Sequence, residues 1–197
     1  MKKLIYQLYV FILGCVFILS ASGLNAEKLK IGDKAPNLIG LNAKNGKRIN
    51  LNRLMTNMQF KRDEKGNLLV GSSGKYISEF VDNVVVLNFF QRTCIPCLKE
   101  IPTFNKIAKK FITNNIKFLY VNIDSGITIA NARQLIKKLK IRIPVMLPNQ
   151  KEAMRKYRVT KLPRLYVINK EKKISHIVSG FEENLESELT SVINNLL

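Results

Sequence analysis

Residues 84–102 read VVVLNFFQRTCIPCLKEIP, and this stretch decides the fold. Residues 84–90 are apolar except for Asn88 and are rich in β-branched and aromatic side chains, as in a central strand covered on both faces. From Cys97 onward the apolar residues recur at a spacing of three, which indicates a helix. The stretch therefore predicts a buried strand, a short loop, and a helix that opens on Cys94 and Cys97.

The two cysteines stand at the spacing CxxC, directly before and within the first turn of the predicted helix. Unpaired N–H groups and partial positive charge at a helix N-terminus favour a thiolate, so we expect a lowered pKa for Cys94. Cys97 lies one turn in, close enough to resolve a mixed disulfide. Pro96 occupies a position where a missing N–H costs little. The pattern predicts a reversible dithiol/disulfide centre.

Other interpretations of the pair are weaker. Half a zinc site would require a second CxxC or paired histidines, whereas the single histidine is the distant His176. A structural disulfide across so short a loop would constrain little of the unfolded chain. Two inert buried thiols are the remaining alternative, but the strand before and the helix after favour redox chemistry.

The chain has 197 residues, which allows one domain and a targeting segment. Hydrophobic residues make up 46%, enough for a sizeable core, and 33 Lys and Arg against 14 Asp and Glu give a net charge of +19. The sequence contains no nucleic-acid-binding motif, so we expect no nucleic-acid partner. Because the lysines are spread along the whole chain, they predict a solvated surface first and attraction to an anionic membrane surface second.

Residues 1–26 have the order of a targeting segment. Two lysines precede the apolar residues 4–19, and small residues follow at 20–23, as in a signal peptide. The apolar stretch is also long enough for an uncleaved membrane anchor, and a rough lipobox before Cys15 makes lipidation a third alternative. Each alternative places residues 27–197 outside the cytoplasm, in the periplasm or the cell envelope. A domain there with a single vicinal cysteine pair is expected to be catalytic rather than disulfide-stapled.

Weaker patterns outline the rest of the domain. Asn45-Gly46 is a turn signal between two short strands, and residues 55–83 read as an insertion that forms a hairpin or a loop. The remaining predictions are strands at 116–123, 164–168 and 174–179, helices at 129–139, 152–157 and 184–197, and a short extended piece at 143–147 broken by Pro144 and Pro148. The main order is thus β, α, β, α, β, β, α, with one β-α-β unit followed by a closing hairpin and a helix.

Three segments resemble the TlpA-like thioredoxins, which include the cytochrome c maturation reductases. They are IGDKAPNLIGLNAKNGKRINL at 31–51, VVLNFFQRTCIPCLKEIP at 85–102 and KYRVTKLPRLYVIN at 156–169. The resemblance implies an α/β thioredoxin-like fold. In this fold a central mixed β-sheet is flanked by helices, with an N-terminal strand extension and an insertion before the active-site strand.

The resemblance also implies roles for single residues. Cys94 would be the nucleophile and Cys97 the resolving thiol. Pro163 would be a cis-proline that shapes a substrate groove, together with Leu162, Thr93 and Pro96. Glu100 would be a proton relay, although a solvated carboxylate is an equal alternative at this helix position. Where relatives have a tryptophan, this chain has Thr93 preceded by Arg92, and a cation near Cys94 would further lower its pKa.

The resemblance implies a thiol-disulfide oxidoreductase that reduces protein disulfides and draws electrons from a membrane thiol donor. We expect a monomer that needs no metal and no cofactor beyond the Cys94–Cys97 disulfide. A peroxiredoxin-like peroxidase is one alternative, since it shares the Ala35-Pro36 segment but not the cysteine pattern. A copper chaperone would need CxxxC and a well-placed histidine rather than His176, and a redox-inactive adaptor is the third alternative.

Overall fold

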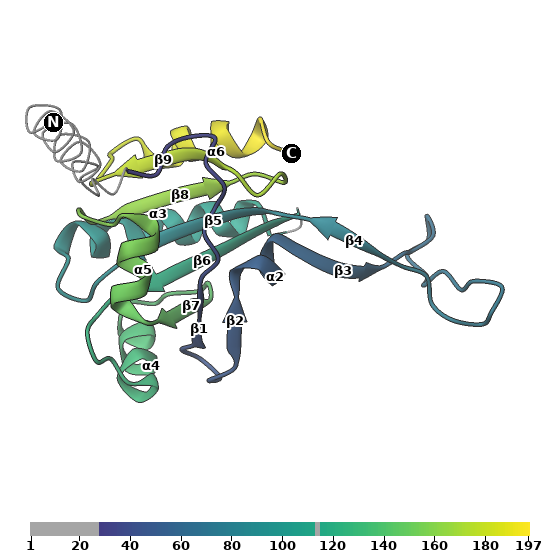
Figure 1. The fold of residues 1–197 in the computed structure, drawn as a ribbon, viewed down its shortest axis with the longest axis horizontal. Coiled ribbons are helices and arrows are strands. Elements are labelled where there is room, and N and C mark those ends of the chain that lie inside the picture. Colours follow the sequence, from purple (N-terminus) through teal and green to yellow (C-terminus); the bar gives the residue numbers. More distant parts are fainter. Residues whose placement is uncertain (1–27, 113–114) are drawn as a thin grey trace, which may run out of the picture.

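A computed structural model describes residues 28–112 and 115–197 and contains one large mixed sheet (Figure 1). Its seven strands lie in the order β2-β1-β7-β6-β5-β8-β9. The strands are β1 (Ile39–Asn42), β2 (Arg48–Asn50), β5 (Val84–Phe90), β6 (Ile116–Asn122), β7 (Val145–Pro148), β8 (Arg164–Ile168) and β9 (Ile174–Ser179). The helices are α2 (Leu51–Met55), α3 (Ile95–Lys110), α4 (Ile129–Lys138), α5 (Gln150–Tyr157) and α6 (Leu185–Asn194).

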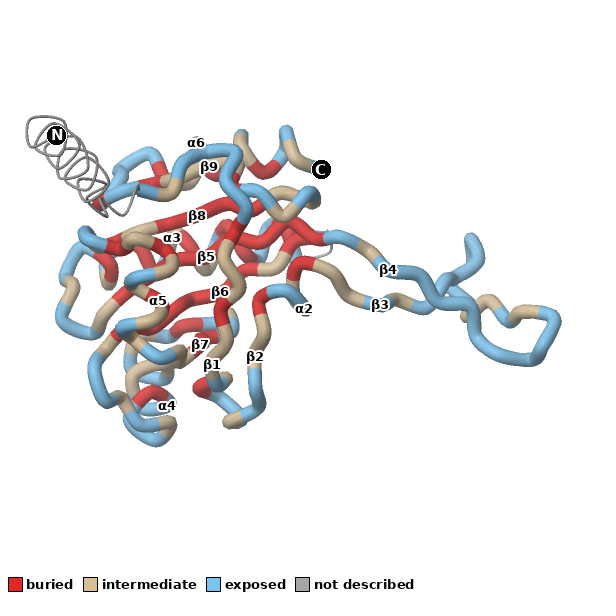
Figure 2. The backbone as a smooth tube through the Cα atoms, in the orientation of Figure 1, coloured by how far each residue is buried: buried red, intermediate tan, exposed pale blue. Residues whose placement is uncertain are grey.

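β5 is the central strand that the sequence predicts. All seven of its residues are buried (Figure 2), because it is paired on both edges and covered on both faces. It runs parallel to β6, with Val84 opposite Ile116 and Phe90 opposite Asn122, and antiparallel to β8. The loop that carries Cys94 therefore begins at the carboxyl end of this central strand.

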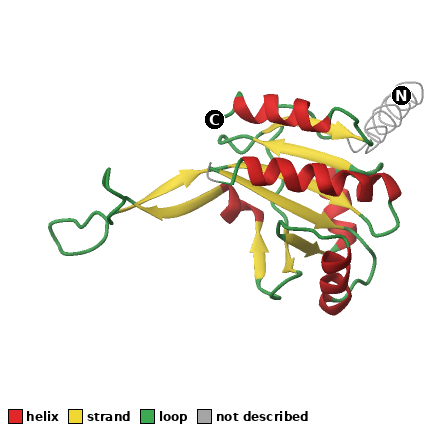
Figure 3. Ribbon diagram, turned by 180° about the vertical axis from the view of Figure 1, so that it is seen from behind, coloured by secondary structure: helices red, strands yellow, loops and turns green. Residues whose placement is uncertain are grey.

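Helices cover both faces of the sheet in two apolar layers. On one face α3, α4 and α6 pack over the strands, and Figure 3 shows α3 and α6 lying across this side. On the other face α2 and α5 enclose a second cluster that includes Tyr157 and Tyr166. The flanked mixed sheet that the resemblance implies is confirmed, and its N-terminal strands β1 and β2 join the sheet through β7.

The predicted strands at 84–90, 164–168 and 174–179 are confirmed with the same bounds. The predicted element order is wrong at one point, because the extended piece at 143–147 is a full sheet strand, β7. Pro144 and Pro148 do not prevent this pairing: Pro144 takes part through its carbonyl oxygen, which accepts a hydrogen bond from the Tyr120 N–H. The chain thus contains two consecutive parallel crossovers, β5-α3-β6 and β6-α4-β7.

Residues 55–83, expected to form a hairpin or a loop, contain a two-stranded arm made of β3 (Thr56–Phe60) and β4 (Ser78–Asp82). The arm extends away from the large sheet and is mostly exposed (Figures 1 and 2). Its exposed apolar side chains include Met58, Phe60, Tyr76 and Phe80, and the rings of Phe60 and Tyr76 meet edge to face.

The predicted signal peptide or anchor at 1–26, with Cys15, lies outside the described residues. Among the helices that the structure describes, none has the length and apolar character needed to cross a bilayer.

Candidate functional site

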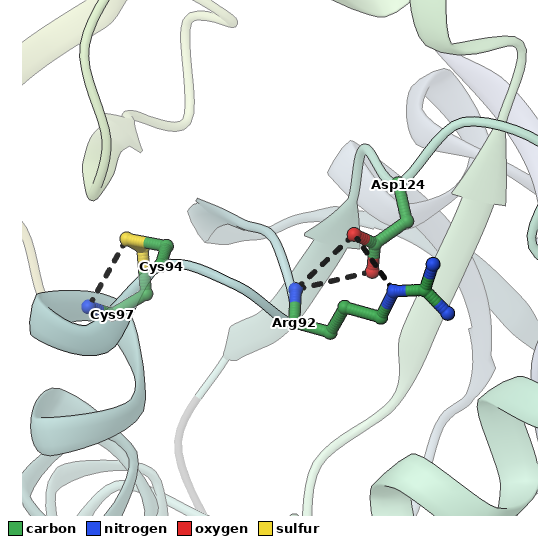
Figure 4. Close-up of a disulfide and its surroundings, with 4 residues drawn as sticks. All are labelled: Arg92, Cys94, Cys97 and Asp124. Carbon is green, nitrogen blue, oxygen red and sulfur yellow. Dashed lines mark hydrogen bonds and ion pairs between the residues drawn. A yellow bond between two sulfur atoms is a disulfide. The ribbon is translucent and has the colours of Figure 1, made fainter.

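Cys94 and Cys97 lie where the sequence predicts, at the start of α3, and form a disulfide (Figure 4). Cys94 is the N-cap residue, and the Cys97 N–H donates to its Sγ over 3.3 Å. The main chain is held by two further bonds, since Cys94 N–H donates to Gln91 O and Leu98 N–H donates to Cys94 O. Cys97 is buried, whereas Cys94 is partly exposed. The outer sulfur is thus the one that a substrate can reach.

Arg92 does not supply the positive charge that the sequence predicts beside Cys94. Its backbone N–H donates to both Asp124 carboxylate oxygens at 3.2 and 3.1 Å, and its Nε lies 3.9 Å from Asp124 Oδ1. Figure 4 shows its side chain extending away from the two sulfurs toward Asp124. The pairing could not be foreseen because Asp124 follows a different strand, β6.

A small cavity of about 360 Å³ adjoins Cys94. Thr93 and Leu162, two of the predicted groove residues, line it. The Leu162–Pro163 peptide bond is cis, and Pro163 is buried beside the cavity while its carbonyl accepts from the Gly180 N–H. Pro96 is exposed in the first turn of α3 and does not line the cavity.

The cavity also includes residues for which the sequence predicts no role. Lys161, just before the cis bond, places a cation in the lining, and Met154 and Val159 add apolar surface. Gln91 lines it too, with its Nε2 bound to the Ile123 carbonyl at 3.0 Å. The position of Lys161 next to Leu162-Pro163 was the available signal. Met154 comes from α5, so only the folded chain brings it here.

Glu100 is buried, which excludes the solvated-carboxylate alternative. Burial raises its pKa to about 7, and the Glu182 carboxylate adds to the rise, while hydrogen bonds from the Asn88 side chain and the Glu182 backbone oppose it. Burial and the charge of Glu100 also raise the pKa of Tyr120. Among the described residues, one Glu100 oxygen, Asn88 Oδ1 and the Tyr120 hydroxyl are buried without a hydrogen-bond partner. A carboxyl that exchanges its proton near neutral pH therefore lies one turn beyond Cys97.

The part of the chain that the structure describes contains no group of side chains arranged as a metal centre. No three His, Cys, Asp or Glu side chains there are grouped to hold an ion. His176 lies on β9, two strands away from β5, and its Nε2 is 2.8 Å from Glu188 Oε1. This geometry gives His176 a structural partner and separates it from the cysteines.

Comparison with known proteins adds a family and several relatives. The profile of the AhpC/TSA family matches residues 69–177, just over half of the 197 residues. Thiol-disulfide oxidoreductase ResA of Bacillus subtilis (strain 168) is 30% identical over 155 residues, which cover 78% of this chain and 70% of the relative. ResA of Bacillus thuringiensis subsp. konkukian is 24% identical over 168 residues, covering 84% and 80%.

Solved structures with the same fold include a thiol-disulfide oxidoreductase thioredoxin domain from Bacteroides vulgatus. It has a TM-score of 0.62 and 18% identity, with 85% of this chain and 100% of that chain covered. A thiol:disulfide interchange protein from a Bacteroides species has a TM-score of 0.63 and 18% identity, with 85% and 91% covered. At this identity the likeness concerns the fold.

Proposed function

The chain belongs to the AhpC/TSA family and is a thiol-disulfide oxidoreductase, and from this premise we propose that it reduces protein disulfides outside the cytoplasm, in cytochrome c maturation. The observation that carries the proposal is the placement of Cys94. Its sulfur caps α3, accepts the Cys97 N–H and opens on a cavity, while the second sulfur is buried behind it. The order of a targeting segment in residues 1–26 supports the compartment, and the resemblance of three segments to the TlpA-like thioredoxins supports the pathway.

The proposed reaction starts from the dithiol form. The Cys94 thiolate, stabilised by the N-terminus of α3, attacks one sulfur of a substrate disulfide, and the other substrate sulfur leaves as a thiolate. Cys97 then loses its proton and attacks the Cys94 sulfur. This second step releases the second substrate thiolate and leaves the Cys94–Cys97 disulfide, so two electrons pass to the substrate.

Glu100 is proposed to accept the proton that Cys97 loses. It is buried one helical turn beyond Cys97, and its raised pKa of about 7 lets it take up and release a proton near neutral pH. A membrane thiol donor would then reduce the Cys94–Cys97 disulfide by the same exchange in reverse. No other cofactor takes part in this cycle.

The substrate chain is proposed to lie across Thr93, Leu162 and Pro163, with Pro96 at the outer side of the site. Thr93 and Leu162 line the cavity beside Cys94, and Pro163 holds the loop between α5 and β8 against it. Lys161 in the same lining favours substrates with acidic residues near the disulfide. The protein is proposed to act as a monomer.

Trapping tests the order of attack. We expect Cys97→Ser to accumulate mixed disulfides with protein partners through Cys94, since the resolving sulfur is gone. Mass spectrometry after non-reducing separation identifies the trapped proteins, and c-type cytochromes or their maturation partners are the expected class.

Cys94→Ser is the matched control and should trap nothing at this site, because the remaining sulfur of the pair, Cys97, is buried. Equal trapping by both variants would contradict the assigned order. Turnover of hydrogen peroxide by the purified protein, with no disulfide substrate reduced, would instead favour the peroxidase alternative.

A further inference from the structure

A second site lies along β6, where the sheet is incompletely paired. β6 pairs with β5 over its whole length, from Ile116 to Asn122, but with β7 at Tyr120 and Val121 alone. Within residues 28–112 and 115–197, the first four residues of β6, 116–119, therefore have no strand partner on the side away from β5. Because the Tyr120 N–H points to β7 and alternate residues share a side, the N–H and C=O of Phe118 face this open edge.

A cavity of about 880 Å³ opens at this unpaired edge. Residues 116–119 all contribute to its lining, so the cavity meets both faces of the sheet. Pro102 and Ala108 of α3 form one wall, and Ile143 and Pro144 form the connection into β7. The volume lies within the range of roughly 300 to 1,000 Å³ that is usual for small-molecule sites, and the lining is mainly apolar.

Cations surround this apolar cavity, and its lining contains no aspartate or glutamate. Lys106, Lys109, Lys117 and Arg142 all take part in the lining. Glu186 pairs with Lys106 at 2.9 Å, whereas the other three have no carboxylate within 4 Å in residues 28–112 and 115–197. The cavity therefore combines an apolar interior with an uncompensated positive rim.

Arg142 is held in position by α3. The Asn105 Oδ1 accepts from the Arg142 backbone N–H at 3.1 Å, and its Nδ2 donates to the Lys140 carbonyl at 3.0 Å. Since both polar atoms of Asn105 are used, this side chain connects the helix to the segment that carries the cation. The rim is therefore built into the packing of α3 against the α4–β7 connection.

The cavity is separate from the cysteine site. Residues 116–119 of β6 lie opposite Val84 to Leu87 of β5, at the strand starts, whereas Cys94 follows the carboxyl end of β5. None of the residues that line the cavity beside Cys94 also lines this one.

We propose that the cavity binds a single acyl chain with an anionic head group, the chain against the apolar walls and the head on Lys109, Lys117 and Arg142. Charge complementarity selects the anion, because a cationic or neutral head would leave three cations without a partner. The apolar lining selects the chain, because burial of each methylene adds to affinity. This binding activity goes beyond thiol–disulfide exchange.

A photoreactive dodecanoate with a diazirine in its chain tests the proposal on the full-length protein in phosphatidylcholine nanodiscs. We expect saturable labelling of peptides from residues 101–119 and 141–145, identified by mass spectrometry. Unlabelled dodecanoate should compete, decanoate should compete roughly tenfold less well because it buries two fewer methylenes, and dodecyltrimethylammonium should not compete.

Charge-reversed variants give the matched comparison. The double variant Lys117→Glu/Arg142→Glu should lower labelling about tenfold, whereas Lys117→Arg should retain it. Lys151→Glu, which reverses one charge on α5 where the double variant reverses two at the cavity, should leave labelling unchanged. Disulfide-reductase turnover should stay at the wild-type level in all of them, which shows that they are folded.

Labelling that is not saturable, that falls outside these peptides, or that the cationic amphiphile displaces equally well would overturn the proposal. Absence of labelling would also overturn the proposal. An extended peptide that pairs with the open edge of β6 would then be the alternative ligand.

Discussion

Glu100 shows how one buried residue links the fold to the chemistry. It follows Cys97 by one turn of α3 and lies against Asn88 of β5, so its carboxyl group is enclosed between helix and sheet. Burial disfavours its charge and raises its pKa to about 7. The same enclosure that costs stability at high pH thus gives this carboxyl the pKa that its proposed role as proton acceptor for Cys97 requires.

The sign of the pH effect follows from that shift. Between the ordinary value of 4.5 and the raised value of about 7, the folded protein binds more protons at Glu100 than the unfolded chain does. The wild type therefore loses stability as pH rises through this window. Glu100→Gln should be more stable than wild type by roughly 3 kcal/mol at pH 8 and show no gain at pH 4, measured by urea unfolding.

Although Glu100→Gln should stabilise the fold, it should lower the turnover of the enzyme. Glu100→Gln should slow the release of mixed disulfides near pH 7, because Cys97 loses its proton acceptor, while attack by Cys94 continues. Glu183→Gln, at an exposed position, should alter neither profile. Stability curves of wild type and Glu100→Gln that run parallel from pH 4 to 8 would show that Glu100 is not a buried titrating group.

At the scale of elements, α3 both carries the cysteine pair and packs against the core of the sheet. Its N-terminus carries the cysteines, and its inward face packs Phe104 against Phe118 and Tyr120 with ring centroids 5.5 and 4.9 Å apart. The packing fixes where the N-terminus of α3 points. The arm formed by β3 and β4 is the contrasting element, since its apolar side chains are exposed and hold no part of the cysteine site.

Substitution of one phenylalanine in α3 and one in the arm compares how much each element contributes to the free energy of unfolding. Phe104→Ala should lower the free energy of unfolding by about 3 to 5 kcal/mol, because it removes a fully buried ring from the core. Phe80→Ala on the arm, where the side chain is 78% exposed, should change it by less than about 0.5 kcal/mol. Guanidinium unfolding at pH 7 gives both values, and a similar loss in both would mean that the arm packs against the domain in solution.

At the scale of the whole molecule, the net charge of +19 acts on every encounter with a partner. Long-range attraction raises the association rate of anionic substrates, and salt screens it over a Debye length of about 10 Å at 0.1 M. Lys161 lines the cavity beside Cys94 and so adds a positive charge at the site itself.

Salt should therefore slow the reduction of acidic substrates selectively. Raising sodium chloride from 50 to 500 mM should lower the second-order rate for a disulfide peptide with acidic flanks several-fold, measured under conditions limited by association. A peptide with neutral flanks should respond far less. Equal salt dependence for the two peptides would show that steering does not contribute.

The sequence alone determined the features whose signals are local. Short stretches predict the buried strand at 84–90, the helix that opens on Cys94 and Cys97, and the two strands that close the sheet, and the structure places them as predicted. Each depends on apolar spacing, helix capping or a turn residue within about ten positions. Segment resemblance then identified the fold that unites them. The cis bond before Pro163 was implied by the family resemblance rather than by the local pattern, and the structure contains it.

Tertiary structure alone decided what depends on distant partners. It made Glu100 buried rather than solvated, turned Arg92 toward Asp124 and brought Met154 to the cavity beside Cys94. It also formed a sheet strand from residues 145–148, which follow Pro144 and end on Pro148. It also left the first half of β6 paired with β5 alone, with its other edge beside a cationic rim. Burial and charge pairing are properties of neighbours in space, and most of these neighbours are tens of residues apart in the chain.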